Sequence, residues 1–182
     1  MGTRVKIDFV SDVSCPWCVI GLKSLEQALE NLGEEVEAEL HFQPFELNPQ
    51  MPAGGQDLDE HLQQKYGRSP EEFAGTRQAI RDRGEELGFL FRMDRRDRIY
   101  NTFDCHRLLH WAGEEGRQLE LKMALFRSYF TEGQDPGARE VMLKAVSDVG
   151  LDVARAAAIL DSNEFHDEVR AQQAFYQQAG IN

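Results

Sequence analysis

The chain has 182 residues, of which 41% are hydrophobic, and it carries a formal net charge of −12 at pH 7. This length suits one domain, or a small domain with a large insertion. The negative charge disfavours nucleic acid or an anionic membrane surface as a partner, and no stretch approaches the roughly 18 apolar residues of a membrane-spanning helix.

The first elements form a strand–helix–strand pattern. Residues 5–10 alternate between apolar and polar side chains before an apolar pair, which predicts a strand. The chain enters this strand from Met1 with no apolar signal core, so we expect a cytoplasmic protein. Apolar residues at helical spacing follow from Pro16 until Gly33 stops the helix. Residues 36–42 alternate again, so we expect two parallel strands joined by a right-handed crossover.

The remaining sequence is mainly helical in pattern. A loop rich in Gly and Pro spans residues 50–56, and Ser69 to Glu72 reads as a capping box with Pro70 at the first helical position. Asp152 is a candidate cap for a later helix. Helices are expected at about 70–88, 96–115, 118–131, 138–149, 153–160 and 164–179.

The motif Cys15-Pro16-Trp17-Cys18 lies where the first strand leads into the first helix. Free N–H groups and the helix dipole at this position stabilise a thiolate at Cys15. Cys18 follows just under one helical turn later, so the two can form a disulfide. We interpret Cys15 as the exposed nucleophile and Cys18 as the more buried thiol that resolves a mixed disulfide. Pro16 and Trp17 are candidates for contact with the substrate.

A structural role or a metal site is the alternative for these cysteines. Cys15 and Cys18 need two further ligands to bind zinc, and Cys105 with His106 could supply them. Zinc ligands rarely occupy the first turn of such a helix, so redox chemistry is favoured and no metal is predicted. Cys105 shares an apolar helix face with leucines, which favours a buried, inert thiol over a third redox cysteine.

His106, His110 and Glu114 recur at helical spacing, which permits a metal site. A solvated helix face, or one that lines a groove, is the simpler interpretation. Asn101, just upstream, is a candidate helix cap.

Four segments resemble the DsbA superfamily of thioredoxin-fold proteins. They are Asp12 to Gly21 around the cysteine pair, Pro44 to Pro49, Asn101 to Ala112, and Val149 to Asp152. The first and third are the most specific. The chain is similar over almost its whole length to the cytoplasmic FrnE-like branch, which is grouped with 2-hydroxychromene-2-carboxylate isomerases and kappa-class glutathione transferases.

The resemblance implies an α/β fold: a thioredoxin-like βαβ unit with a large helical insertion. Residues 1–49 are then the βαβ half, residues 50–165 the insertion, and residues 166–182 a helix that returns toward the core. In the family, a Gly-Ile-x-Gly-Val-Pro segment follows, whose proline faces the cysteines, but this chain stops at Asn182. We therefore expect a truncated chain without its last strands. The resemblance also implies that Asn101 or His106 contacts the substrate.

The leading functional hypothesis is a dithiol–disulfide oxidoreductase or isomerase that acts on disulfides of proteins or small thiols. It needs no bound cofactor, and glutathione is a candidate co-substrate. The runner-up is a glutathione-dependent isomerase or transferase of the two related groups. Those enzymes usually carry serine at the first position, so the retained Cys18 favours exchange. A third alternative is a fragment that binds or forms a homodimer through an open sheet edge.

Overall fold

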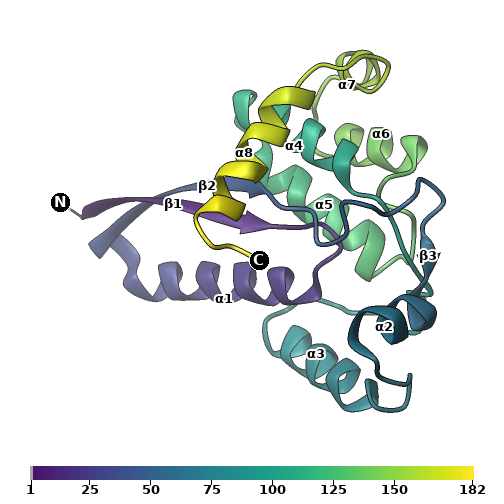
Figure 1. The fold of residues 1–182 in the computed structure, drawn as a ribbon. Helices are drawn as coiled ribbons and strands as arrows, with labels where there is room; N and C mark the ends of the chain where they lie inside the picture. Colours follow the sequence, from purple (N-terminus) through teal and green to yellow (C-terminus); the bar gives the residue numbers. More distant parts are fainter. Residues whose placement is uncertain (1) are drawn as a thin grey trace.

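The computed structural model describes residues 2–182 and shows a parallel βαβ unit joined to a set of helices. Strands β1 (Thr3–Ser11) and β2 (Val36–Pro44) pair in parallel, from Thr3 opposite Val36 to Ser11 opposite Pro44. Helix α1 (Pro16–Leu32) connects them and runs alongside the strands (Figure 1). The predicted α/β class and the parallel pairing are confirmed.

Helix α1 begins and ends where the sequence predicted. Cys15 has extended backbone geometry at the N-cap, and proline follows at the first helical position, where no N–H is needed. At the other end, Gly33 has φ of 52°, a conformation that favours glycine. The short 3-10 turn η1 (Gly33–Glu35) then leads into β2. Cys15 is therefore held at the first turn of a well-defined helix.

The helical part divides between two sides of the βαβ unit. Helices α2 (Leu58–Tyr66) and α3 (Ala74–Glu86) lie near the N-terminal end of α1, and four further helices gather on the opposite side (Figure 1). The last helix, α8 (His166–Gln178), packs against β2. The four gathered helices are α4 (Phe103–Glu114), α5 (Gln118–Phe130), α6 (Arg139–Asp148) and α7 (Val153–Leu160).

Two predicted helix starts are wrong. The capping box forms, since Ser69 N donates to Glu72 Oε2 at 2.7 Å, but the next residues make turns and α3 begins at Ala74. The helix expected from residue 96 begins at Phe103. Upstream of it, β4 (Arg98–Ile99) pairs in antiparallel fashion with β3 (Gln56–Asp57). This tertiary pairing overrides the helical pattern.

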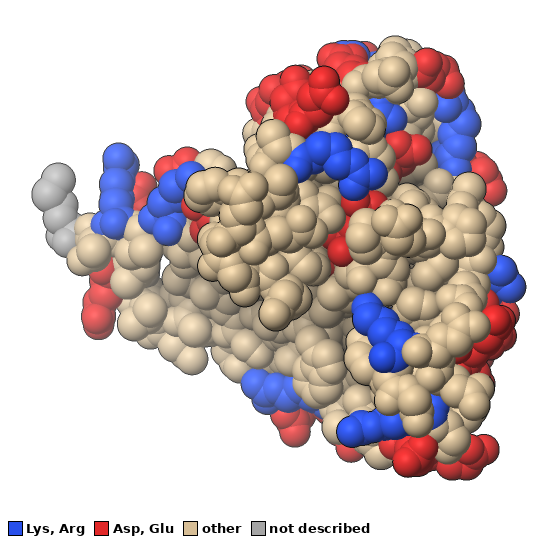
Figure 2. Space-filling view, viewed as in Figure 1, with Lys and Arg blue, Asp and Glu red and all other residues tan. Residues whose placement is uncertain are grey.

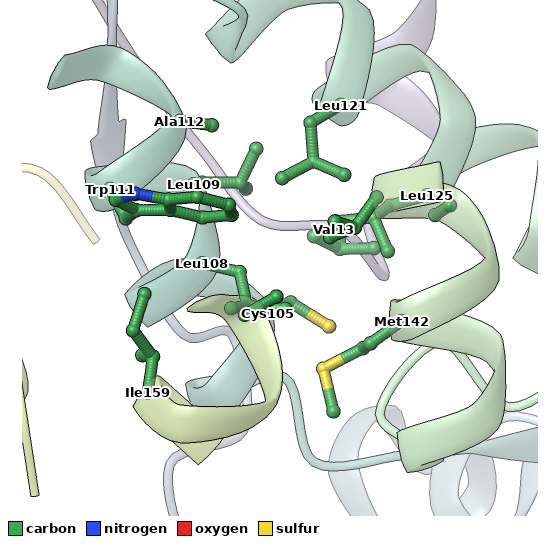
Figure 3. Close-up of a cluster of buried hydrophobic side chains, with 13 residues drawn as sticks. Val13, Cys105, Leu108, Leu109, Trp111, Ala112, Leu121, Leu125, Met142 and Ile159 are labelled. Atoms are coloured by element: carbon green, nitrogen blue, oxygen red, sulfur yellow. The ribbon is translucent and has the colours of Figure 1, made fainter. Parts of the chain in front are cut away.

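Two clusters of buried side chains hold these parts together. One joins α1, β2 and α5 with the link around Phe89 and Phe91. The other joins α4 to α7, and Val13, from the loop after β1, inserts among these helices (Figure 3). Val13 is completely buried. The loop that precedes Cys15 is therefore anchored in the helical part.

The end of β2 is tied to α8 by a buried carboxylate. Glu46 is 3% exposed and pairs with Arg170, while the guanidinium of Arg170 also lies 3.8 Å from the centroid of the Phe103 ring. Within residues 2–182, the sheet beside α1 has two strands, and no helix has the length and apolar character needed to cross a membrane. The domain boundaries given above stay a prediction.

Candidate active site

The two cysteines lie together at the first turn of α1, and both are free thiols. The Cys15 side chain caps its own helix, because its Sγ accepts a hydrogen bond from the backbone N of Cys18 at 3.3 Å. The sequence predicted an exposed Cys15 and a more buried Cys18, but both side chains are partly buried. The difference between them lies in what they face: Cys15 lines a cleft, whereas Cys18 packs against the cluster around Phe42.

The two thiols shift each other's ionisation. The side-chain interaction between them raises the pKa of Cys15 and lowers the pKa of Cys18. Helix position alone had predicted a lowered pKa at Cys15, and the neighbouring sulfur reverses that direction in the resting pair. The first pKa therefore describes the pair of thiols and not either cysteine alone.

A buried carboxylate forms the floor beneath the cysteine pair. Asp12 is 2% exposed, and its carboxylate accepts hydrogen bonds from Ser14 Oγ at 3.1 Å and from Leu47 N at 2.8 Å. His106 Nε2 lies 3.2 Å from the other carboxylate oxygen. Burial alone would raise the pKa of Asp12, but the hydrogen bond and attraction of His106 lower it to about 2. Asp12 is thus an ionised acceptor, and His106 donates through Nε2.

A cleft of about 530 Å³ opens in front of Cys15. Its wall comes from the start of α1, from α2 and α3, and from the link before β4, and it is largely apolar, with Leu58, Phe73 and Ile80 among its residues. This volume lies within the range of small-molecule sites. The cleft can therefore hold an apolar or extended group next to the Cys15 sulfur.

The charged side chains that line the cleft are all basic among the residues described. They are Lys65, Arg68, Arg77 and Arg96, and basic side chains lie over the region of α2 and α3 in Figure 2. This lining contrasts with the overall charge of −12. Arg77 has a partner in Asp59 at 3.6 Å, but no carboxylate of residues 2–182 lies within 4 Å of the other three cations. The cleft therefore attracts negatively charged groups.

Arg96 brings one of these positive charges beside the cysteine loop. Its Nη2 lies 3.5 Å from the carbonyl oxygen of Ser14, and its Nε donates to Tyr129 Oη at 2.8 Å. The guanidinium also lies 5.1 Å from the centroid of the Tyr129 ring. These contacts fix Arg96 while leaving its charge without a carboxylate partner. The sequence analysis missed Arg96, because no local motif marks a residue that approaches Ser14 from the other half of the chain.

The structure places the other predicted site residues in two groups. Pro16 and Trp17 line the cleft, and Trp17 is 52% exposed. Asn101 and His106 lie outside its lining. Asn101 accepts from Phe103 N and donates to Met51 O, both at 2.9 Å, so it ties the loop at Met51 to the start of α4, although the N-cap residue of α4 is Thr102. Contact of Asn101 or His106 with the substrate stays a prediction.

The alternative metal sites are not assembled. Within residues 2–182, no group of three or more His, Cys, Asp or Glu side chains could hold a metal ion. The Cys105 thiol donates to Pro136 O at 3.0 Å and points toward Met142 (Figure 3). Burial raises its pKa well above the ordinary value, so Cys105 stays a thiol.

A parallel βαβ unit with two cysteines on the first turn of its helix defines the thioredoxin-like class, here with helices inserted after the second strand. Residues 6–182 match the model of the DsbA-like thioredoxin domain, and the chain belongs to that family. The resemblance to the DsbA superfamily drawn from the sequence is thereby confirmed.

Three individual proteins are similar to this chain in sequence or in structure. A probable DsbA oxidoreductase, SCO1869 from Streptomyces coelicolor, is 31% identical with a TM-score of 0.87, over 97% of this chain and 76% of that one. The uncharacterized protein YwbO of Bacillus subtilis is 26% identical over 97% of this chain and 82% of its own length. The cytosolic disulfide reductase DsbM of Pseudomonas aeruginosa, solved with glutathione, is 17% identical with a TM-score of 0.63, over 97% and 81% of the two chains.

Proposed function

We propose that this protein is a thiol–disulfide oxidoreductase in which Cys15 attacks the substrate and Cys18 resolves the mixed disulfide. The observation that carries this proposal is that Cys15 lines the cleft, whereas Cys18 lies behind it against the core. A substrate sulfur that enters the cleft meets Cys15 first. Membership of the DsbA-like family supports the same chemistry.

The reaction has two exchange steps. As the pair's proton moves to Cys18, the Cys15 thiolate attacks a substrate disulfide, forms a mixed disulfide and releases one substrate sulfur as a thiolate, which takes up a proton. Cys18 then loses its proton and attacks Cys15 Sγ. The Cys15–Cys18 disulfide forms, the bond from Cys15 to the substrate breaks, and the second substrate sulfur leaves with the electron pair. The cysteines lose two electrons and the substrate disulfide gains two.

Glutathione is the thiol that we propose returns the protein to its reduced form. Its carboxylates match the basic lining of the cleft, where Lys65, Arg68 and Arg96 have no acidic partner among the described residues. The cytoplasmic location predicted from the sequence provides glutathione in its reduced form. The glutathione complex of DsbM shows that a protein of this fold accommodates it.

A glutathione-dependent isomerase would use the same cleft but would need only the first position of the motif. The position of Cys18 favours exchange, because its backbone N is 3.3 Å from Cys15 Sγ and interaction with Cys15 lowers the pKa of the Cys18 thiol. An isomerase gains nothing from such a partner. We therefore place the oxidoreductase first.

Paired serine variants test the proposed function. In a single-turnover reaction of the pre-reduced protein with oxidised glutathione, Cys15→Ser should release no reduced glutathione, whereas Cys18→Ser should stop with one glutathione bound per chain on Cys15, seen by mass spectrometry of acid-quenched samples. Cys105→Ser is the matched control and should retain wild-type turnover. A Cys18→Ser protein with wild-type turnover and no adduct would reject exchange through the pair and favour the isomerase.

A further inference from the structure

A buried lysine lies behind the cysteine pair, on the side away from the cleft. Lys122, in α5, is 1% exposed. Its ammonium lies 5.2 Å from the centroid of the Phe126 ring and 5.8 Å from that of the Phe42 ring. Cys18 packs against the cluster that contains both rings. The positive charge and the Cys18 sulfur therefore occupy the same part of the interior.

Lys122 has no ion-pair partner to account for its burial. No carboxylate of the residues described lies within 4 Å of its ammonium. Burying an unpaired charge costs far more than any stability that the aliphatic part of the side chain contributes. Two rings facing an ammonium offset part of this cost, in the range of about 1–2 kcal/mol for desolvated cation–π contacts. A negative charge that appears during the reaction would offset more.

The groups that surround Lys122 identify that charge. The ionisable neighbours are Asp12 from the loop after β1, Cys15 and Cys18 at the start of α1, and Cys105, His106 and His110 from α4. The residues of β2 and α8 that line the same small pocket, such as Gln43 and Gln172, are uncharged. Asp12 already has a hydrogen-bond partner in His106. The cysteine thiolate is the negative charge that still lacks a partner.

We propose that Lys122 is a positioning residue for the Cys18 thiolate: its buried positive charge favours ionised Cys18 and so accelerates the resolving step. In that step Cys18 loses a proton to solvent, bonds to Cys15 Sγ and displaces the substrate sulfur, which leaves as a thiolate. Burial lowers the pKa of Lys122, and attraction to Lys122 is among the causes that lower the pKa of Cys18. Asp12 acts in the opposite direction on both thiols.

The inference rests on the proposed function, and variants that preserve shape test it. Lys122→Met keeps the length of the side chain and removes the charge, whereas Lys122→Arg keeps the charge. The matched control is Lys144→Met, which makes the same change of net charge at a side chain that is 62% exposed on α6. Thiolate absorbance at 240 nm reports the first pKa of the pair, and equilibration with glutathione buffers reports its reduction potential.

We expect Lys122→Met to raise the first pKa of the pair by about one unit, a tenfold loss of thiolate. The equilibrium constant with glutathione should shift about fivefold to tenfold toward the disulfide, which is ~20–30 mV in a two-electron couple. Acid-quenched turnover samples should contain more glutathione adduct on Cys15. Lys122→Arg and Lys144→Met should stay within about twofold of wild type in these readouts. A folded Lys122→Met protein with wild-type pKa and potential would overturn the inference.

The wild-type protein supplies a second test that does not depend on a variant folding. Because coupling between two sites is reciprocal, the thiolate must raise the pKa of Lys122 as much as Lys122 lowers that of the thiol. NMR of protein labelled with ¹⁵N at lysine Nζ should therefore give a higher pKa for Lys122 in the reduced than in the oxidised state. Equal values in both states would reject the role of Lys122, while formation of the Cys15–Cys18 disulfide in the same samples would leave the proposed function intact.

Discussion

Asp12 Oδ1 lies 3.2 Å from His106 Nε2, although the two residues are 94 positions apart in the chain. Both side chains are nearly inaccessible to solvent, with 2% and 3% exposure. The contact joins the loop before the cysteines to a helix of the inserted segment. The interaction that positions Asp12 beside the cysteine pair therefore also stabilises the folded protein.

This contact predicts a specific loss of stability in acid. The pKa of Asp12 is about 2 in the folded protein, against 3.8 for an unperturbed aspartate, so its contribution to the free energy of unfolding is present above pH 4 and is lost as the pH falls through 2. The shift corresponds to roughly 2 kcal/mol. In urea titrations, the free energy of unfolding should therefore be higher for wild type than for Asp12→Asn at pH 6. This difference should shrink by about that amount between pH 6 and pH 2. A difference in the free energy of unfolding that does not change with pH would contradict the lowered pKa of Asp12.

Arg107 should be among the residues most sensitive to substitution. Its guanidinium is almost fully buried and donates to the carbonyl oxygens of Ile159, Ser162 and Glu164 at 2.5, 2.6 and 2.9 Å. Arg107→Met removes all three hydrogen bonds from the interior, and only Ile159 O keeps another donor, from Ser162, so we expect it to lower the free energy of unfolding by ~3 kcal/mol or more. Arg139→Met, at an exposed ion pair, should cost less than ~1 kcal/mol in the same denaturant titration. An equal loss in the free energy of unfolding for both variants would show that the buried hydrogen bonds of Arg107 do not stabilise the protein more than an exposed ion pair does.

Two glycines of α3 should respond oppositely to alanine. A Cβ at Gly84 would lie 2.3 Å from Phe91 Cδ2 and 2.7 Å from the carbonyl oxygen of Phe89. Gly84→Ala should therefore destabilise the protein by ~1–3 kcal/mol. Gly75 has open space around the same position, and Gly75→Ala should be neutral or stabilising by up to ~1 kcal/mol because alanine favours helix. Thermal unfolding of both variants tests the packing of α3 against the link after it.

The basic lining of the cleft predicts a preference for negatively charged disulfides. Arg96→Gln and Arg68→Gln remove cleft charges that have no carboxylate partner within residues 2–182. We expect the second-order rate constant for reduction of oxidised glutathione by the pre-reduced protein to fall about tenfold in the double variant, equivalent to ~1.4 kcal/mol. The same rate constant for the neutral 2-hydroxyethyl disulfide should stay within about twofold of wild type. A parallel loss for both substrates would indicate damage to the fold instead of lost recognition.

Local sequence signals predicted the part of the site that a single segment, α1 with its cysteine pair, forms. The cap, the proline and Gly33 lie within a single helix, so the bounds of α1 followed from Cys15 to Gly33 alone. The start of α4 was wrong because Arg98 and Ile99 pair with residues 56–57, a contact without a local signature. Lys122 was missed for the same physical reason: on sequence it is one polar residue on a helix, and only packing against the rings of Phe42 and Phe126 buries it.

The separation of the site along the chain also sets the order in which a nascent protein can build it. Strand β1, α1 and β2 are contiguous, so the cysteine pair can reach its helix as soon as residue 44 is free to fold. Asp12 can contact His106 only later, because translation at ~5–20 residues per second needs about 3–12 s to extend the chain from residue 44 to residue 106. During that interval the cysteines lie on their helix, but neither the Asp12–His106 contact nor Lys122 is in place beside them. A newly made chain is therefore expected to carry a redox pair with different chemistry from that of the finished protein.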